Sequence, residues 1–191
     1  MIIVTGCGRA GTQYMWQALN AAGIRVGHEE WGIDGQIGFH AAIERRGAAL
    51  NRAWRDKADP DDVVLHQTRE PLGNISSVQT FQDYSWDFIC EHSAIKRDDP
   101  LILRCMQYWC VWNRKASDMA VFRYKIEEVQ KEWPTICGFL GIPTTTPLME
   151  ETRKGWHHRT HTDLTWEDLE STDKDWARIV MDNAKEYGYT S

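Results

Sequence analysis

The residues with the clearest chemistry stand in a glycine-rich loop near the start of the chain. Gly6, Gly8 and Gly11 follow an apolar run at 2–5, and a helical pattern begins at Thr12. Glycines let a backbone approach a phosphate closely, and the first N–H groups of a helix point toward an anion. The loop therefore predicts a site for a ligand that carries phosphate.

Three interpretations of this loop predict different ligands. A nucleoside-triphosphate loop needs Lys and Ser/Thr after its last glycine, but Thr12 and Gln13 stand there. A dinucleotide fingerprint matches fully in its glycine spacing, and Glu29 and Glu30 lie near the distance of a ribose-binding acid. The third interpretation uses Arg9, a cation within the loop, to neutralise a leaving phosphate.

A second segment favours the third interpretation. Residues 62–68 are expected to form a buried strand, Arg69 and Pro71 follow it, and Ser77 lies eight positions after the arginine in an expected helix. An arginine offers a planar fork of donors to a phosphate, and a serine hydroxyl adds a neutral contact. In its loop and in this segment the chain resembles the sulfotransferases that use 3′-phosphoadenosine 5′-phosphosulfate (PAPS).

The resemblance extends downstream, with two departures. Residues 122–128 resemble the strand and Tyr-Glu turn of these sulfotransferases, and 138–143 resemble the Phe-Leu-Gly-x-Pro ending that follows, but Lys125 rather than an acid comes after Tyr124. The segment 153–155 resembles a loop that closes over the 3′-phosphate, although the Trp- and His-rich sequence after it differs from that loop. The resemblance covers most of the chain in order.

On this resemblance, PAPS is the implied co-substrate, no metal is required, and the acceptor is a small molecule or a glycan. The implied nucleotide-binding residues are Gly8, Arg9, Ala10, Gly11, Thr12, Gln13, Arg69, Ser77, Arg153 and Lys154. Arg9 is expected against the bridging oxygen, and Thr12 and Gln13 are expected to cap the helix and hold phosphate oxygens. The alternatives are a P-loop nucleotide or sugar kinase, a nicotinamide-dependent oxidoreductase, and a catalytically inactive nucleotide-binding module.

A base for the acceptor proton is expected just after the second strand. His28, Glu29 and Glu30 stand there side by side. A neutral histidine suits a pH near 7, whereas a glutamate needs burial to raise its pKa. We expect His28 or Glu29 to be the base, with Glu30 as the next candidate.

Alternating strand and helix patterns must position these residues. The expected strands are 2–5, 24–28, 62–68 and 119–123, and the expected helices are 12–22, 39–55, 72–82, 100–116, 126–131 and 134–140, followed by two near the C-terminus. This order predicts an α/β fold with one domain over 1–191, a three-layer sandwich with a central parallel sheet flanked by helices, similar to P-loop NTPases. Arg9, His28 and Arg69 would meet at the carboxyl ends of the strands.

The composition and charge of the chain limit the kinds of partner that are expected. The net charge is −6 and no basic block is present, which argues against nucleic-acid and anionic-membrane binding. The sequence enters a strand at its second residue without an apparent leader, and an odd number of scattered cysteines indicates reduced thiols, so a cytoplasmic location is expected. Cys7 lies in the loop, where a helix N-terminus lowers the pKa of a thiol, so alkylation is expected to inactivate the protein.

Overall fold

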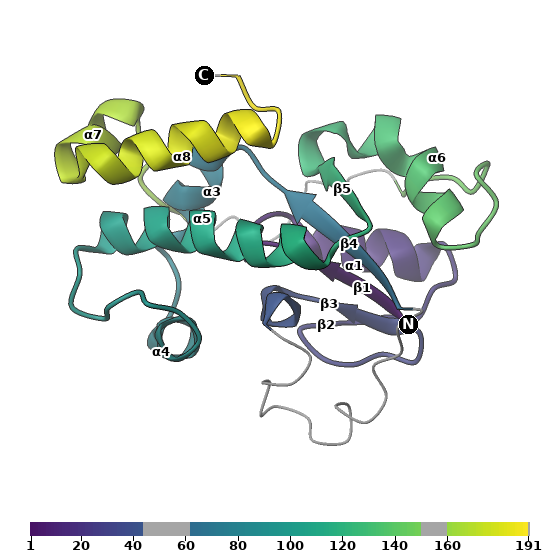
Figure 1. Cartoon of the computed structure of the whole chain (residues 1–191). Helices are drawn as coiled ribbons and strands as arrows, with labels where there is room; N and C mark the ends of the chain where they lie inside the picture. Colours follow the sequence, from purple (N-terminus) through teal and green to yellow (C-terminus); the bar gives the residue numbers. More distant parts are fainter. Residues whose placement is uncertain (44–61, 150–159, 191) are drawn as a thin grey trace.

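A parallel β-sheet forms the centre of the molecule in the computed structural model, which describes residues 1–43, 62–149 and 160–190. Its strands are β1 (Ile2–Thr5), β2 (Val26–His28), β3 (Gly35–Ile37), β4 (Val63–Thr68) and β5 (Phe122–Lys125). The strand order is β2-β3-β1-β4-β5, and every neighbouring pair is parallel (Figure 1). All carboxyl ends of the strands therefore lie along one edge of the sheet.

Helices cover both faces of this sheet. They are α1 (Thr12–Ala21), α3 (Pro71–Val78), α4 (Asp83–Glu91), α5 (Leu101–Met119), α6 (Val129–Phe139), α7 (Trp166–Thr172) and α8 (Lys174–Glu186), with 3-10 turns η1 (Phe39–Ala42) and η2 (Ile126–Glu128). In the described ranges, no helix has the length and apolar character needed to cross a membrane.

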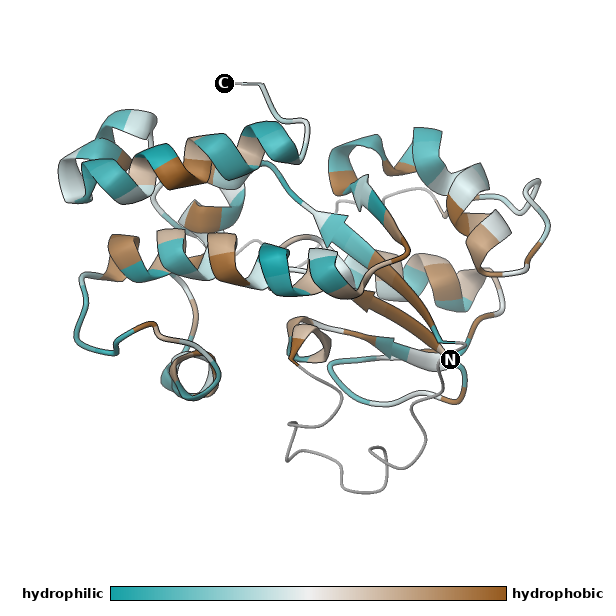
Figure 2. Ribbon diagram, viewed as in Figure 1, coloured by the Kyte–Doolittle hydropathy of each residue, from teal (hydrophilic) through white to brown (hydrophobic). Residues whose placement is uncertain are grey.

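Two separate hydrophobic cores define the layers. Leu19 of α1 and Trp133 of α6 pack with Val4 and Leu65 on one face, whereas α3, α5, α7 and α8 enclose a larger aromatic core on the other. Figure 2 shows the apolar central strands between helices whose outer surfaces are hydrophilic. The predicted α/β three-layer sandwich with a central parallel sheet is confirmed.

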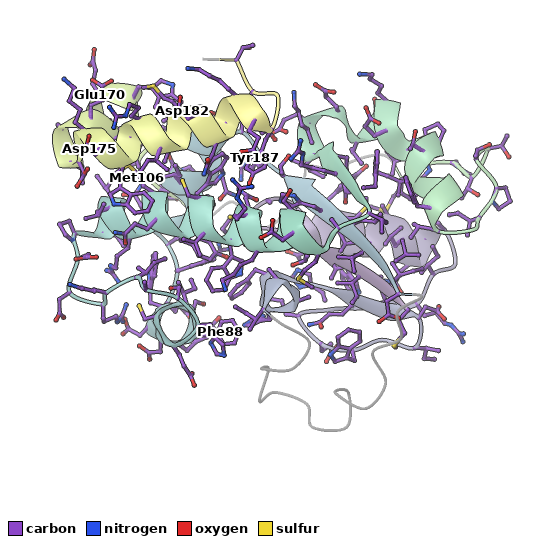
Figure 3. All side chains as sticks on the ribbon, viewed as in Figure 1. Phe88, Met106, Glu170, Asp175, Asp182 and Tyr187 are labelled. Carbon is purple, nitrogen blue, oxygen red and sulfur yellow. The ribbon has the colours of Figure 1, made fainter. Side chains whose placement is uncertain are left out.

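The interface between α5 and α8 shows how the outer helices attach. Met106 is fully buried between them, while Glu170, Asp175 and Asp182 lie on the outer surface of α7 and α8 (Figure 3). Apolar residues that recur along one stripe of a helix direct that stripe to the core. Trp109 of α5 is also fully buried.

Strand β3 is the main element that the sequence pattern does not reveal. It has three residues, Gly35, Gln36 and Ile37, two of which have low strand propensity. Hydrogen bonds to β1 on one side and β2 on the other hold it in place. A Cβ on Gly35 would lie 1.7 Å from the carbonyl oxygen of Ile2, so the close pairing requires glycine.

Several other expected element bounds need correction. The helix expected at 39–55 is seen only as η1, and 44–61 lie outside the described residues. The stretch 83–98, to which no element was assigned, contains α4, and the strand expected at 24–28 begins at Val26. The two helices expected at 126–131 and 134–140 are η2 and one continuous α6, which accommodates Pro134. The last strand runs two to three residues later than expected because α5 continues to Met119.

Candidate functional site

The loop from Gly6 to Gly11 joins β1 to α1 and is held through its carbonyl oxygens. Asn74 Nδ2 donates to the Gly8 oxygen at 3.2 Å, Arg69 Nη1 to the Arg9 oxygen at 2.9 Å, and Gln67 Nε2 to the Ala10 oxygen at 2.6 Å. Gln67 comes from β4, Arg69 from the connection after it and Asn74 from α3, and Asn74 and Gln67 are fully buried. The loop is therefore fixed from one side.

This anchoring determines where the loop N–H groups point. In a planar trans peptide the N–H is directed opposite to the C=O, so the N–H groups of Arg9 and Gly11 point away from the anchoring side chains. Arg9 (φ 67°) and Gly11 (φ 86°) have left-handed backbone conformations, and the Ala10 N–H between them donates to the Cys7 oxygen at 3.3 Å. The N–H groups of Arg9 and Gly11, next to the start of α1, are therefore the loop donors suited to an anion.

Gln67 itself is held by a second buried group. The hydroxyl of Tyr124 in β5 donates to Gln67 Oε1 at 2.6 Å, and burial raises the pKa of Tyr124 far above its usual value. Sequence reasoning used Tyr124 only as a fold marker and missed Gln67. A glutamine within an apolar strand is the signal, because a buried amide needs hydrogen-bond partners.

The start of α1 differs from the expected capping. Gly11 is the N-cap and forms no side-chain cap, so the capping role expected for Thr12 and Gln13 is wrong. Thr12 is instead the first helical residue, and its Oγ1 lies 3.2 Å from His28 Nε2. The backbone N–H groups of Thr12 and Gln13 belong to the first turn, which has no intrahelical acceptors.

Arg69 and Ser77 lie along one face of α3. A Cβ on Gly73 would lie 3.4 Å from Arg69 Nη2, which places the guanidinium over that glycine. Ser77 is one turn further along the same helix, hence on the same face. The N-terminus of α3 itself is capped by Glu70, whose carboxylate accepts from Leu72 N and Gly73 N at 2.9 and 2.7 Å.

Arg9 extends toward the aromatic residues beside α4. Its guanidinium carbon lies 5.3 Å from the centre of the half-buried Phe81 ring, within cation–π range. The Tyr108 hydroxyl of α5 accepts the Gly8 N–H at 2.8 Å on the same side. Arg9, Arg69 and the loop N–H groups therefore gather at the carboxyl edge of the sheet.

His28 ends β2 at this edge, and Glu29 and Glu30 follow it. His28 is half-buried, and burial lowers its pKa, an effect that the nearby carboxylates of Glu29 and Glu30 partly oppose. Both glutamates are exposed, and Glu29 has a left-handed backbone (φ 56°) with its N–H donated to the Ile37 oxygen at 2.8 Å. A neutral imidazole beside α1 is able to accept a proton near pH 7.

His40 is a further candidate base that the sequence did not indicate. It follows β3, its ring centre lies 4.5 Å from that of Phe88, and burial lowers its pKa while Glu29 partly opposes the shift. Its Nδ1 is buried and has no hydrogen-bond partner among the described residues. His40 escaped notice because the strand before it was not recognised.

The burial of Cys7 and Trp86 excludes both from a direct role in the site. Cys7 is 1% exposed, and burial raises its pKa well above the usual value, so the expected reactive thiolate is wrong. Trp86 of α4 lies in the core at 2% exposure, so it is not available to an acceptor or an adenine. Arg153 and Lys154 lie outside the described residues.

The fold and this site define an α/β protein whose β1–α1 loop is fixed by side chains of the next strand and helix. No protein-family model matches the chain, and no curated protein or solved structure shows a significant match to it. A functional assignment must therefore come from the arrangement of the residues themselves.

Proposed function

We propose that the protein is a sulfotransferase that transfers the sulfuryl group of PAPS to a hydroxyl or amine of a small-molecule or glycan acceptor. The hydrogen bond from Arg69 Nη1 to the Arg9 carbonyl oxygen, at 2.9 Å, supports this proposal most directly. It brings the two arginines that the reaction needs to the same loop. The five cysteines are free thiols, which favours the reducing cytoplasm as the location.

The residues present fit this nucleotide. The 5′-phosphosulfate would lie against the loop, with the N–H groups of Arg9 and Gly11 and the first turn of α1 as donors. Arg69 and Ser77, on one face of α3, would hold the 3′-phosphate, and Arg153 and Lys154 are proposed to close over it. Glu70 occupies the N-terminus of α3 and so directs the phosphate to the side of this helix.

The chemistry is a metal-free in-line displacement at sulfur. A bond forms between the acceptor oxygen and sulfur, while the bond from sulfur to the bridging oxygen breaks and its electron pair stays on the departing phosphate. Arg9 would stabilise this growing negative charge. The acceptor proton would go to His28, Glu29 or His40, which lie on the other side of the loop.

Two alternatives fit the geometry less well. Dinucleotide-binding sheets place the second strand directly beside the first, but here β3 separates β1 from β2 and its acids Glu29 and Glu30. A nucleotide kinase needs a lysine and a metal-binding hydroxyl after the last glycine. Thr12 and Gln13 stand there, and the Thr12 hydroxyl contacts His28.

Calorimetric titration tests the proposal. Wild-type protein should bind 3′-phosphoadenosine 5′-phosphate without metal, and Arg69→Ala should weaken this binding about 10- to 100-fold because a charged hydrogen bond is lost. Arg178→Ala is the matched control, since this exposed arginine of α8 pairs only with Asp175 in the described structure. Binding of ATP with magnesium, or of NAD, in place of the bisphosphate would contradict the proposal.

Turnover separates an enzyme from an inactive binding module. Incubation with PAPS and a mixture of phenols, alcohols and amino sugars should release 3′-phosphoadenosine 5′-phosphate and form a sulfated acceptor. Arg9→Ala should slow this release about 10²- to 10³-fold, as for other donors that stabilise a developing charge. Binding without any sulfated product would favour the inactive module.

A further inference from the structure

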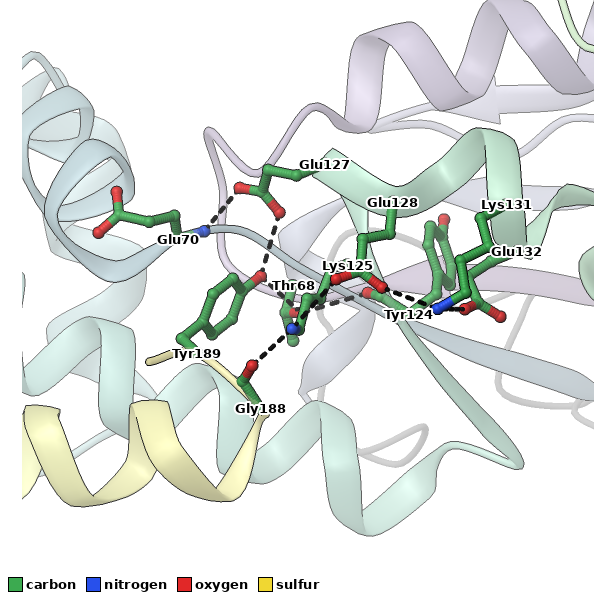
Figure 4. A network of polar contacts seen from close by, with 10 residues as sticks. All are labelled: Thr68, Glu70, Tyr124, Lys125, Glu127, Glu128, Lys131, Glu132, Gly188 and Tyr189. Atoms are coloured by element: carbon green, nitrogen blue, oxygen red, sulfur yellow. Dashed lines mark hydrogen bonds and ion pairs between the residues drawn. The ribbon is translucent and has the colours of Figure 1, made fainter. Parts of the chain in front are cut away.

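The C-terminal residues Gly188 and Tyr189, here named the C-terminal clamp, return from α8 to the carboxyl ends of β4 and β5 (Figure 4). The Tyr189 hydroxyl lies 3.0 Å from Thr68 Oγ1 and 3.3 Å from Glu127 Oε2, and its single proton is shared between these two acceptors. Thr68 is fully buried at the end of β4. The clamp is thus joined to the strand end that immediately precedes Arg69.

Lys125 fixes the clamp from the neighbouring strand. Its Nζ donates to the Gly188 carbonyl oxygen at 2.5 Å, lies 4.9 Å from the centre of the Tyr189 ring, and pairs with Glu128 at 3.3 Å. One ammonium group thus makes a hydrogen bond, a cation–π contact and an ion pair, and these three contacts hold the clamp against β5. This contact accounts for Lys125 at a position where the resembling sulfotransferases carry an acid.

Glu127 extends the same network to the residue after Arg69. One of its carboxylate oxygens accepts from Tyr189, and the other accepts the backbone N–H of Glu70 at 2.8 Å. Glu70 in turn caps α3. The clamp therefore reaches both neighbours of Arg69: it contacts the side-chain hydroxyl of Thr68 directly, and the backbone N–H of Glu70 through Glu127.

We propose that the C-terminal clamp positions Arg69 and thereby gives the nucleotide site its preference for a 3′-phosphate. The inference rests on the proposed function, because Arg69 is assigned there to the 3′-phosphate. Tyr189 acts through Thr68 and Glu127 and does not touch the nucleotide, so it is a positioning residue. Its loss should chiefly affect ligands that carry a 3′-phosphate, because Gln67 and Asn74 still hold the loop proposed for the 5′-phosphate.

Two nucleotides and two tyrosines make the test specific. Tyr189→Phe should weaken binding of 3′-phosphoadenosine 5′-phosphate about 3- to 10-fold, the effect of one lost hydrogen bond, and keep binding of adenosine 5′-phosphate within about twofold of the wild type. Tyr187→Phe is the matched control, because the buried Tyr187 hydroxyl has no hydrogen-bond partner in the described part of the chain. It should bind both nucleotides as the wild type does.

A double-mutant cycle excludes a general structural effect. In an Arg69→Ala background, Tyr189→Phe should have no further effect on bisphosphate binding, since the residue that it positions is gone. Equal weakening of both nucleotides by Tyr189→Phe, or no weakening of either, would overturn the inference while leaving wild-type bisphosphate binding intact. Failure of the wild type to bind the bisphosphate would instead overturn the proposed function, and the inference with it.

Discussion

The two sides of the β1–α1 loop are built differently. On the anchoring side, Gln67, Arg69 and Asn74 bind three successive loop carbonyls at 2.6 to 3.2 Å. On the base side, formed by the ends of β2 and β3, Glu29 is exposed and His28 and His40 are half-buried. One side is fixed by short buried hydrogen bonds, and the other presents titratable groups near solvent.

The difference corresponds to two physical requirements. Binding a fixed anion is favoured when the donors are already oriented, since no ordering cost remains to be met on binding. Proton transfer needs a group that a second substrate can reach and whose pKa lies near the working pH. The anchoring side therefore fits nucleotide binding, and the base side fits contact with the acceptor.

The largest effects are expected on the base side. Among His28→Ala, Glu29→Gln and His40→Ala, the variant that removes the base should lower kcat about 10²- to 10⁴-fold, measured as release of 3′-phosphoadenosine 5′-phosphate from PAPS. Burial lowers the pKa of both histidines, so each imidazole stays neutral to a lower pH than a free histidine does. If a histidine is the base, the pH at which kcat drops to half on the acid side should therefore lie below about 6.5.

Nucleotide affinity provides the control for these three variants. Each should bind 3′-phosphoadenosine 5′-phosphate within about twofold of the wild type, because none contacts the anchoring side chains. If all three keep normal kcat, the base lies elsewhere. If they lose nucleotide binding instead, the division into two sides is wrong.

A buried histidine on the anchoring side is expected to affect stability rather than turnover. His66 of β4 is fully buried, its Nε2 lies 3.0 Å from Asn113 Oδ1, and burial lowers its pKa to about 4. The unfolded chain binds a proton near pH 6.5, so this contribution is complete above that pH and is lost as pH falls toward 4. The loss should approach about 3 kcal/mol.

Urea unfolding at pH 7, 5 and 4 measures this loss. The free energy of unfolding of the wild type should fall relative to that of His66→Gln, which lacks the titrating group but shares all other carboxylates and histidines. A constant difference between the two proteins over this range would show that His66 does not titrate between the folded and unfolded states.

The glutamine anchor should have a smaller effect. Gln67→Leu leaves the Ala10 oxygen and the Tyr124 hydroxyl buried without their partner, which should cost about 1 to 3 kcal/mol of stability and weaken bisphosphate binding. Gln130→Leu, on the exposed face of α6, is the control and should change neither. Unchanged binding in Gln67→Leu would mean that the loop keeps its shape without this anchor.

The sequence revealed what depends on local pattern. The apolar runs of β1 and β4 and the periodic residues of α5 were found because strand and helix periods are written in neighbouring residues. Strand β3 was hidden because its pairing partners are distant in sequence, and with it His40. Arg69 was found through its motif, whereas Gln67 acquires its role only when β4 meets the loop.

The smallest effect is expected at Cys7, and it tests whether the anchoring side stays closed in solution. Its thiol is buried, and Sγ lies 3.5 Å from the Trp109 carbonyl oxygen. Iodoacetamide should therefore label the half-buried Cys90 first and leave nucleotide binding unchanged, with labelling sites mapped by mass spectrometry. Early labelling of Cys7 with loss of binding would show that the loop opens readily, because a thiol enclosed by α5 reacts only when the loop leaves its anchors.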